Sequence, residues 1–116
     1  MSNLAPTQRA GELDQRVELQ KEVRVSDGQG GFTREWQTHA TVWAQVRPLS
    51  GNERAHSERL AAEGGYRVVI RNRDDVNEAW RVYWIDREIG MNIRFSGDPG
   101  KRDLYRTMEC DRGVAV

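Results

Sequence analysis

The chain has 116 residues, which suits one domain with one modest core. Only 37% of the residues are hydrophobic and the mean hydropathy is -0.82, so much of the apolar bulk must come from four Trp, three Tyr and two Phe. The 18 acidic and 18 basic side chains balance, whereas a protein that binds nucleic acid by neutralising phosphates usually has a basic excess. A small core rich in aromatic side chains fits a subunit that completes its burial against neighbouring proteins. It equally fits a small barrel filled by its own aromatic side chains.

The single cysteine, Cys110, excludes an internal disulfide bond. It lies in a predicted strand, where we expect a small packed side chain rather than a nucleophile. No apolar run approaches membrane-spanning length, and the first residues lack the charged and apolar regions of a signal peptide. We therefore expect assembly in a reducing cytoplasm and no membrane partner.

The first predicted elements are a flexible N-terminal arm at residues 1–12 and a strand that follows it. In the strand, apolar and polar side chains alternate, and Lys21 interrupts the apolar side. The apolar positions are Val17, Leu19, Val23 and Val25. A period of two over this length predicts a half-buried β-strand.

A glycine-rich cluster, Ser26–Gly31, predicts a turn, because glycine admits positive φ. The strand that follows runs from Phe32 to Val46. Its apolar phase shifts near His39–Thr41, which predicts a β-bulge there. The two strands are expected to form an antiparallel hairpin.

Pro48 ends the second strand, and a helix-start signal follows at once. Ser50 and Glu53 have the spacing of a capping box, in which each side chain can bond the other residue's backbone amide. Gly64–Gly65 provides a helix stop. The segment 49–65 is therefore predicted as a short helix or ordered loop. Because it is polar and short, a helix here is marginal alone, and we expect a partner to order it.

Alternation returns after this segment and predicts four more strands separated by loops. These are expected at Tyr66–Arg71, Trp80–Ile85, Met91–Phe95 and Leu104–Cys110. In the last strand we expect Leu104, Met108 and Cys110 on one face, with Arg106 breaking the phase. Successive short antiparallel strands with glycine turns favour a small closed barrel or sandwich.

The predicted fold is therefore mainly β, a small antiparallel β-barrel or sandwich of about six strands with one short helix or ordered loop inserted after the second strand. The barrel domain is expected to span residues 13–112. Residues 113–116 are expected to form a C-terminal tail.

The residue patterns of catalysis are not found, so no catalytic, cofactor-binding or metal-binding residue is predicted, and we expect a protein that is not an enzyme. His39 and His56 lie outside any ligand cluster, whereas zinc needs three or four converging ligands. Gly28–Gly31 lacks the Lys-Ser/Thr of a phosphate-binding loop. Ser50 and Ser57 have no readable His–Asp partners.

Four tryptophans are expected either in the core or at subunit interfaces: Trp36, Trp43, Trp80 and Trp84. An alternative remains open, because small barrels of the oligonucleotide-binding kind stack bases on exposed rings in a basic groove. The arginines that could serve such a groove are Arg34, Arg47, Arg81 and Arg94. The balanced acidic residues weigh against this nucleic-acid-binding barrel.

Several motifs occur in a characteristic order along residues 11–110. They are Leu13–Gln20, Asp27–Phe32, Trp36, Val42–Val46, Ser50–Glu53 and Val69–Arg71. In this order they resemble the head–tail joining (head-closure, or stopper) proteins of long-tailed double-stranded DNA phages and gene transfer agents. The likeness departs from the family pattern at residues 80–89, where a strand, a turn and a strand are compressed.

The resemblance implies a structural virion protein: a β-barrel subunit in a homo-oligomeric ring at the head–tail interface, assembled in the bacterial host cytoplasm. The ring would bind portal or adaptor proteins above and the tail terminator or tail tube below. It would retain packaged DNA, let double-stranded DNA pass without sequence-specific binding, and offer the tail a docking surface. Another connector-ring protein, such as a tail terminator, is the alternative within this class.

The resemblance also implies that the segment 49–65 faces the channel and gates it. The residues expected to do so are Ser50, Glu53, Arg54, His56, Glu58, Arg59 and Glu63. A channel wall that DNA must later pass should be polar without being strongly basic. The acidic residues of this segment offset its arginines.

Overall fold

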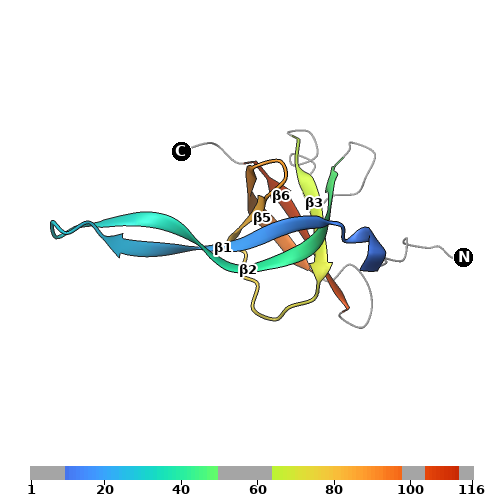
Figure 1. Ribbon diagram of the computed structural model, residues 1–116, viewed down its shortest axis with the longest axis horizontal. Coiled ribbons are helices and arrows are strands. Elements are labelled where there is room, and N and C mark those ends of the chain that lie inside the picture. The colour runs from blue at the N-terminus through green and yellow to red at the C-terminus, as the bar shows by residue number, and fades with distance from the viewer. Residues whose placement is uncertain (1–9, 50–63, 98–103, 113–116) are drawn as a thin grey trace, which may run out of the picture.

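Six antiparallel strands and one short 3-10 helix form the regular structure of the computed structural model, which describes residues 10–49, 64–97 and 104–112 (Figure 1). The elements are η1 (Ala10–Glu12), β1 (Gln15–Ser26), β2 (Phe32–Pro48), β3 (Tyr66–Arg71), β4 (Arg81–Trp84), β5 (Ile89–Gly97) and β6 (Tyr105–Asp111). The expectation of a mainly β protein with about six strands is confirmed.

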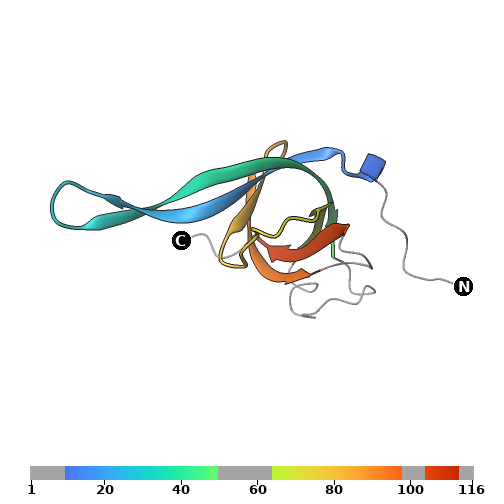
Figure 2. The same cartoon turned by 90° about the horizontal axis from the view of Figure 1, so that it is seen from below.

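The strands close into a barrel in the order β1-β2-β3-β6-β5-β4, and β4 pairs back onto β1. Figure 2 shows the barrel from below, with β5 and β6 curving beneath the β1/β2 ribbon. Every neighbouring pair is antiparallel. Closure removes the sheet edges on which other chains could pair, so the barrel wall is complete in itself.

Alternate residues of each strand point inward and form one core. Its fully buried members include Val17 and Leu19 from β1, Ile70 from β3 and Met108 from β6. Cys110 is also fully buried in this core, as its position in a strand predicted. Burial raises the pKa of the Cys110 thiol, so the side chain behaves as a small apolar group.

The last strand differs from the prediction at its start. β6 begins at Tyr105, and Leu104 lies before it with 61% of its surface exposed, so Leu104 does not share the buried face of Met108. Arg106 does not break the phase but continues it. Its guanidinium donates hydrogen bonds to Asn72 Oδ1, the Arg73 carbonyl oxygen and Ser96 Oγ. A long cationic side chain can occupy an inward position near a strand end, where loop oxygens are within reach.

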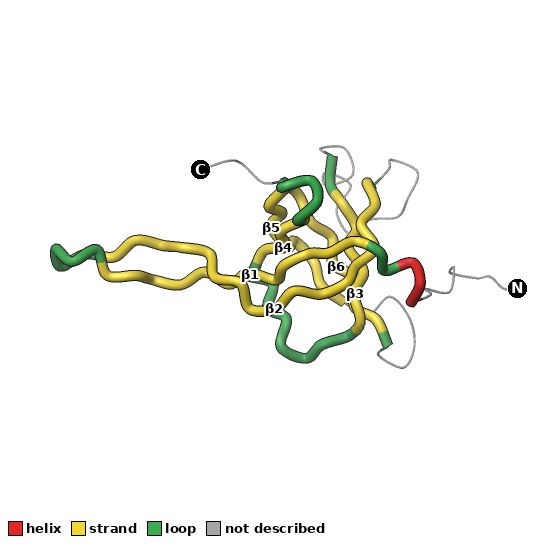
Figure 3. The backbone as a smooth tube through the Cα atoms, in the orientation of Figure 1, coloured by secondary structure: helices red, strands yellow, loops and turns green. Residues whose placement is uncertain are grey.

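β1 and β2 continue far beyond the barrel as a two-stranded ribbon (Figures 1 and 3). β4 pairs with β1 only as far as Gln20, and β3 pairs with β2 only from Ala44 onward. Residues 21–37, hereafter the projecting hairpin, therefore have only each other as strand neighbours among the described residues. The projecting hairpin accounts for the elongated shape, whose principal extents are 62 × 28 × 23 Å.

The turn at the hairpin tip is built by Asp27 and two glycines. The Asp27 carboxylate accepts hydrogen bonds from the Gln29 and Gly31 amides at 2.7 and 3.1 Å, and the Asp27 amide donates to the Gly31 carbonyl at 3.1 Å. Gly28 and Gly30 have φ of 79° and 85°, a region that side chains with a Cβ rarely adopt. The turn predicted at Ser26–Gly31 is confirmed with this chemistry.

A β-bulge lies where the projecting hairpin leaves the barrel. Leu19 pairs with Ala40 and Gln20 pairs with Thr38, so His39 is the extra residue of β2. This confirms the bulge predicted at His39–Thr41. A bulge bends its strand and increases the local twist, so it sets the direction in which the hairpin departs.

Three predicted segments extend outside the described residues. Residues 1–9 of the N-terminal arm and residues 113–116 of the C-terminal tail are not described, and of the arm only residues 10–12 are, as η1. Most of the inserted helix or loop, residues 50–63, is not described either. The residues that flank this segment are described. The Leu49 amide donates to the Gly65 carbonyl at 2.8 Å, and Leu49 is buried. Both ends of the insertion therefore leave the barrel side by side.

Candidate docking surfaces

One side of the hairpin base is held by a contact between β1, β2 and β4. Arg81 Nε donates a hydrogen bond to Gln20 Oε1 at 2.5 Å, and the Arg81 guanidinium lies 4.7 Å from the centre of the Trp36 ring. A cation over an aromatic face contributes about 0.5–1 kcal/mol at exposed sites. Arg81 of β4 therefore connects the barrel wall to the base of the projecting hairpin. It also covers Gln20, of which only 8% is exposed.

Glu18 adds polar contacts at the same place. Its carboxylate accepts hydrogen bonds from Thr38 Oγ1 at 2.6 Å and from Gln20 Nε2 at 2.8 Å. These bonds, with Thr38 first and Gln20 second, hold the pKa of Glu18 below its ordinary value. The carboxylate is therefore charged at neutral pH and links the two strands across the bulge.

The other side of the base is held by the loop between β3 and β4. His39 Nε2 lies 2.7 Å from Asp75 Oδ2, and the ring of His39 lies 4.7 Å from that of Trp80. Arg73 donates two hydrogen bonds to the same carboxylate, both at 3.0 Å. The Arg73 guanidinium, and then His39, hold the pKa of Asp75 well below its usual range. The bulge residue His39 is thus tied to the loop between β3 and β4.

The outer face of β1 and β2 carries arginines stacked on exposed rings. Arg16 lies 4.7 Å from the Trp43 ring centre on the barrel, and Arg24 lies 4.6 Å from the Phe32 ring centre near the hairpin tip. Trp43 is 52% exposed and Phe32 is 60% exposed. Large exposed rings with neighbouring arginines are typical of residues that anchor protein interfaces.

The hairpin tip also places two cations directly opposite each other. Arg24 and Arg34 are cross-strand partners, so their side chains project from the same face. Arg34 forms an exposed ion pair with Glu22 at 3.9 Å. Like charges directly opposite each other destabilise a sheet, and an exposed ion pair offsets this by little. An acidic partner would therefore be favoured on this face.

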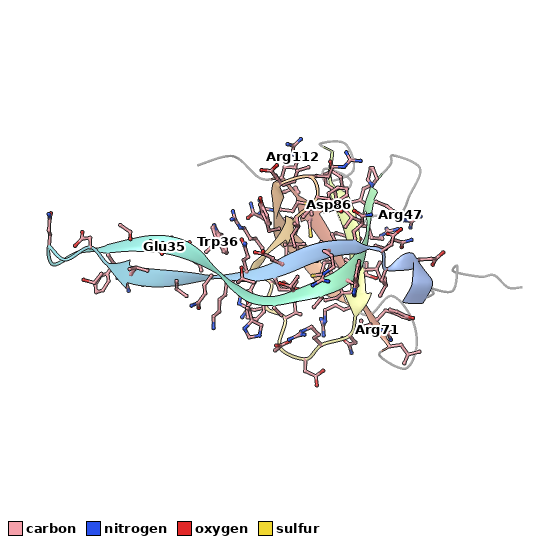
Figure 4. All side chains as sticks on the ribbon, in the orientation of Figure 1. Glu35, Trp36, Arg47, Arg71, Asp86 and Arg112 are labelled. Carbon is pink, nitrogen blue, oxygen red and sulfur yellow. The ribbon has the colours of Figure 1, made fainter. Side chains whose placement is uncertain are left out.

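Two pockets lie at the other end of the barrel, and they share Asp14. The smaller, of about 330 Å³, is lined by Leu13, Asp14, Trp43 and Arg71. The larger, of about 620 Å³, includes Asp14 and the side chain of Trp84. Arg71 lies at the end of the molecule opposite the hairpin tip (Figure 4). The molecule thus has a projection at one end and recesses at the other.

The four tryptophans divide into two pairs. Trp84 is 8% exposed and belongs to the core, and Trp80 packs against the core from outside. Trp36 lies on the projecting hairpin under Arg81, and Trp43 is exposed on the barrel. The interface role of the second pair stays a prediction. The four tryptophans therefore do not lie together in one site.

The arginines considered for a nucleic-acid groove are similarly dispersed. Arg34 lies on the hairpin, and Arg47 lies at the opposite end of the molecule (Figure 4). Arg94 donates to Asp111 Oδ2 at 2.8 Å, so its charge is already paired. Arg81 is engaged with Gln20 at the hairpin base.

The predicted channel residues cannot be placed on this structure. Ser50, Glu53, Arg54, His56, Glu58, Arg59 and Glu63 all lie outside the described residues. Within the part of the chain that is described, no group of three or more His, Cys, Asp or Glu is arranged to hold a metal ion. No helix among the described elements is long and apolar enough to cross a membrane.

Sequence reasoning missed the length of the projecting hairpin. The signal was present in the alternation itself, because β1 and β2 have 12 and 17 residues while β3 has 6. Strands in a small barrel rarely need more than about ten residues. Two adjacent strands that are much longer than the rest must extend beyond the wall that the others build.

The described residues define a small closed β-barrel that carries a projecting hairpin and recesses at opposite ends. Residues 9–113 match the family model of the phage head completion protein. The chain is also 30% identical over 104 residues to head completion protein gp16 of Bacillus phage SPP1, covering 86% of this chain and 92% of that protein.

Two solved structures share the fold. Protein SF1141 of Shigella flexneri 2a has a TM-score of 0.69 at 22% identity, covering 92% of this chain and 98% of that one. A chain from the virion of a native gene transfer agent particle has a TM-score of 0.59 at 24% identity, covering 89% of this chain and 96% of that one.

The chain belongs to the phage head completion protein family, because the family model matches nearly its whole length. The resemblance to the head–tail joining proteins is confirmed. The chain is therefore a structural virion protein of the region where head and tail join, and it associates with other head or tail proteins there.

Proposed function

We propose that this chain is a head-closure subunit that forms a ring of identical copies between the portal or adaptor and the tail. The ring retains packaged DNA and provides the surface on which the tail docks. The observation that carries the proposal is the family match over residues 9–113, which includes both the barrel and the projecting hairpin. The work of such a subunit is mechanical rather than catalytic.

The physical character of the chain supports this role. The barrel wall is closed, so it is a stable block that needs no partner to complete its sheet. The full sequence has no net charge, and a ring of neutral subunits does not hold passing DNA by counterion release. The exposed aromatic side chains of Phe32 and Trp43 remain available for contact with neighbouring proteins.

We further propose that the segment 49–65 narrows the channel of the ring. Two observations support this: the Leu49 amide bonds the Gly65 carbonyl, and Leu49 is buried in the barrel. The segment is thus attached at two adjacent points of a rigid wall. The sequence of the segment has a capping-box pattern at Ser50 and Glu53, which predicts a helix start that contacts with neighbouring copies would stabilise.

The test replaces residues 51–63 by Asn-Gly, a short turn that preserves the Leu49–Gly65 pair. We expect a folded barrel that joins particles, while the particles lose their DNA after packaging. DNA content is measured by nuclease protection and electron microscopy of purified particles. Full DNA retention by the variant contradicts the gating role. The controls are particles assembled without the chain, which we expect to be empty and tail-less, and particles assembled with the unaltered chain, which we expect to be filled and tailed.

Two competing functions give different results. A tail terminator is recovered with the tail tube rather than with the portal or adaptor in pulldown from disrupted particles. A single-stranded nucleic-acid-binding barrel is favoured by one observation, the 52% exposure of Trp43. Base stacking on that ring would quench tryptophan fluorescence at moderate salt, and Trp43→Ala would remove the quenching. We expect no quenching by single-stranded DNA.

A further inference from the structure

The projecting hairpin has open sheet edges, although the barrel wall is closed. It consists of two strands, and each has no strand on its outer side among the described residues (Figure 3). On β2 this free edge comprises residues 32–38, and on β1 it comprises residues 21–26. A two-stranded ribbon is only marginally stable alone in water, and its unpaired backbone groups are a template for a further strand.

The edge of β2 directs its backbone groups outward at every second residue. The Asp27 amide donates to the Gly31 carbonyl, so that opposite pair is hydrogen-bonded. Hydrogen-bonded and non-hydrogen-bonded pairs alternate along an antiparallel ladder, so the Arg24–Arg34 pair is non-hydrogen-bonded and both residues direct their amides outward. With the register, the same alternation gives the outward amides of the β2 edge: Phe32, Arg34 and Trp36.

The side chains of these three residues define what a third strand must carry. They share one face of the hairpin and place a cation between two aromatic rings; the Phe32 residue is 60% exposed and the Arg34 side chain 76% exposed. Across the hairpin Arg34 faces Arg24, and its ion pair with Glu22 is exposed. Since such a pair offsets the repulsion by little, an acidic residue beside Arg34 would be favoured, with apolar residues beside the two rings.

The edge of β1 fits such a strand less well. On that edge Arg24 has an acidic neighbour, Glu22, two residues along the same strand, whereas the face of β2 that carries Arg34 has no acidic residue within 32–38. Lys21 stands at the start of the β1 edge, and lysine on an edge strand disfavours pairing. The β1 edge also leads directly into the barrel, because β4 pairs with β1 as far as Gln20.

We propose that an extended segment of another head or tail protein pairs with residues 32–38 as a third strand, with a carboxylate side chain beside Arg34 and apolar side chains beside Phe32 and Trp36. The chain associates with other proteins of the head–tail region, which supply the partner. The inference goes beyond the head-closure role, because it names a surface and the chemistry of its ligand and depends neither on ring formation nor on DNA retention.

A defined peptide tests this chemistry with the free chain. The probe is the capped peptide Thr-Val-Thr-Glu-Thr-Val-Thr, whose glutamate can lie beside Arg34 while its valines lie beside Phe32 and Trp36. Its sequence is the same in both directions, so parallel and antiparallel pairing give the same contacts. The matched control peptide has lysine in place of glutamate. Amide hydrogen exchange of the isotope-labelled chain, measured by NMR, reports binding residue by residue.

Strand addition should slow exchange in an alternating pattern. The largest slowing is expected at the three outward amides, and less at Thr33 and Glu35, whose amides already face β1. The lysine peptide should bind roughly tenfold more weakly, because like charges then lie side by side. Arg34→Glu should reverse the preference between the peptides. Lys21→Glu, which makes the same change of charge on the other face of the hairpin, should leave the preference unchanged.

Several results would overturn the proposal. They are equal binding of the two peptides, unaltered exchange with either peptide, and an alternating pattern on the edge of β1 instead of β2. Exchange at residues 32–38 that slows with rising chain concentration in the absence of peptide would show that the edge pairs with a second copy, which also contradicts the proposal.

In particles, the matched variants are Arg34→Pro and Arg24→Pro. The two residues belong to one pair with outward amides, so each proline removes one charge and one outward donor without removing a hydrogen bond of the hairpin. Circular dichroism checks that the barrel is intact. We expect Arg34→Pro to be lost from purified particles and Arg24→Pro to be retained. Equal behaviour of the two variants contradicts the third strand and leaves intact the head-closure role, which is tested by replacing residues 51–63.

Discussion

The barrel and the projecting hairpin are built from the same two strands, yet they are stabilised in different ways. In β1 the inward residues Val17 and Leu19 are completely buried, while Val25, in the same alternation, is 37% exposed. The difference lies in the neighbours, because β3 to β6 cover the first pair and no described strand covers the last. Alternation makes a residue available for burial, and the surrounding elements decide whether burial occurs.

This comparison predicts the largest contrast for truncation in the two regions. Leu19→Ala leaves a cavity in the core and should lower the free energy of unfolding by about 2–5 kcal/mol. Val25→Ala, on the same strand and in the same phase, should lower it by no more than about 0.5 kcal/mol. Urea unfolding of the monomeric chain, followed by circular dichroism, measures both. A similar loss for the two variants would show that the hairpin is part of the cooperative core.

The sequence alone was sufficient for most of the barrel. Period-two alternation placed Val17 and Leu19 on the buried side of a strand, and the glycine cluster and phase shift placed the turn and the bulge. These signals are local, so they survive without knowledge of the neighbours. Arg106 was misjudged because its acceptors, Asn72 and Ser96, come from other strands and loops.

The docking surfaces were only partly predictable. All four tryptophans had the same two interpretations, core or interface, and only the barrel's closure separates buried Trp84 from exposed Trp43. The pairing of Arg24 with Arg34 depends on the register of the hairpin. Register follows from the turn and the bulge together, so a one-residue error in either would have moved these side chains to other faces.

A second contrast concerns the turn at the hairpin tip. Gly30→Ala forces a side chain into a φ of 85°, at a cost of about 1–2 kcal/mol. A Cβ at this position would meet nothing within 4 Å, so the cost is in the backbone alone. Amide hydrogen exchange should speed up within residues 21–37 and stay unchanged in the core strands.

The control for the turn is Gly11→Ala. A Cβ at Gly11 also meets nothing within 4 Å, and its φ lies outside the positive region. This substitution should leave exchange in the hairpin unchanged. Faster exchange of the core amides in Gly30→Ala would mean that the hairpin and barrel unfold as one unit.

The third contrast tests how the two regions are joined. Arg81→Ala removes the guanidinium over Trp36 and the hydrogen bond to Gln20. We expect the free energy of local opening to fall by about 1 kcal/mol. Amide hydrogen exchange should detect this fall at the hairpin base only. Arg16→Ala, which removes the same kind of stacking from Trp43 on the barrel, is the matched control. Equal effects of the two variants on the hairpin would show that Arg81 does not join the regions.

The smallest effect concerns pH. Because the folded state lowers the pKa of Asp75, chiefly through Arg73 and then His39, the charged carboxylate stabilises the folded chain. That stability is fully present above the ordinary aspartate pKa of about 3.9 and is lost as the pH falls toward the lower folded value. Since Asp75 is largely exposed, its contribution should not exceed about 1 kcal/mol.

Asp75→Asn should therefore reduce the fall in unfolding free energy between neutral pH and the acid range, and Asp74→Asn, adjacent in the same loop, is the control. The readout that separates barrel from hairpin is local. Asp75 bonds His39, the bulge residue at the hairpin base, so acid should first increase exchange of the amides around the bulge. If acid instead loosens the core strands first, the carboxylate belongs to the stability of the barrel and not to the junction that directs the hairpin.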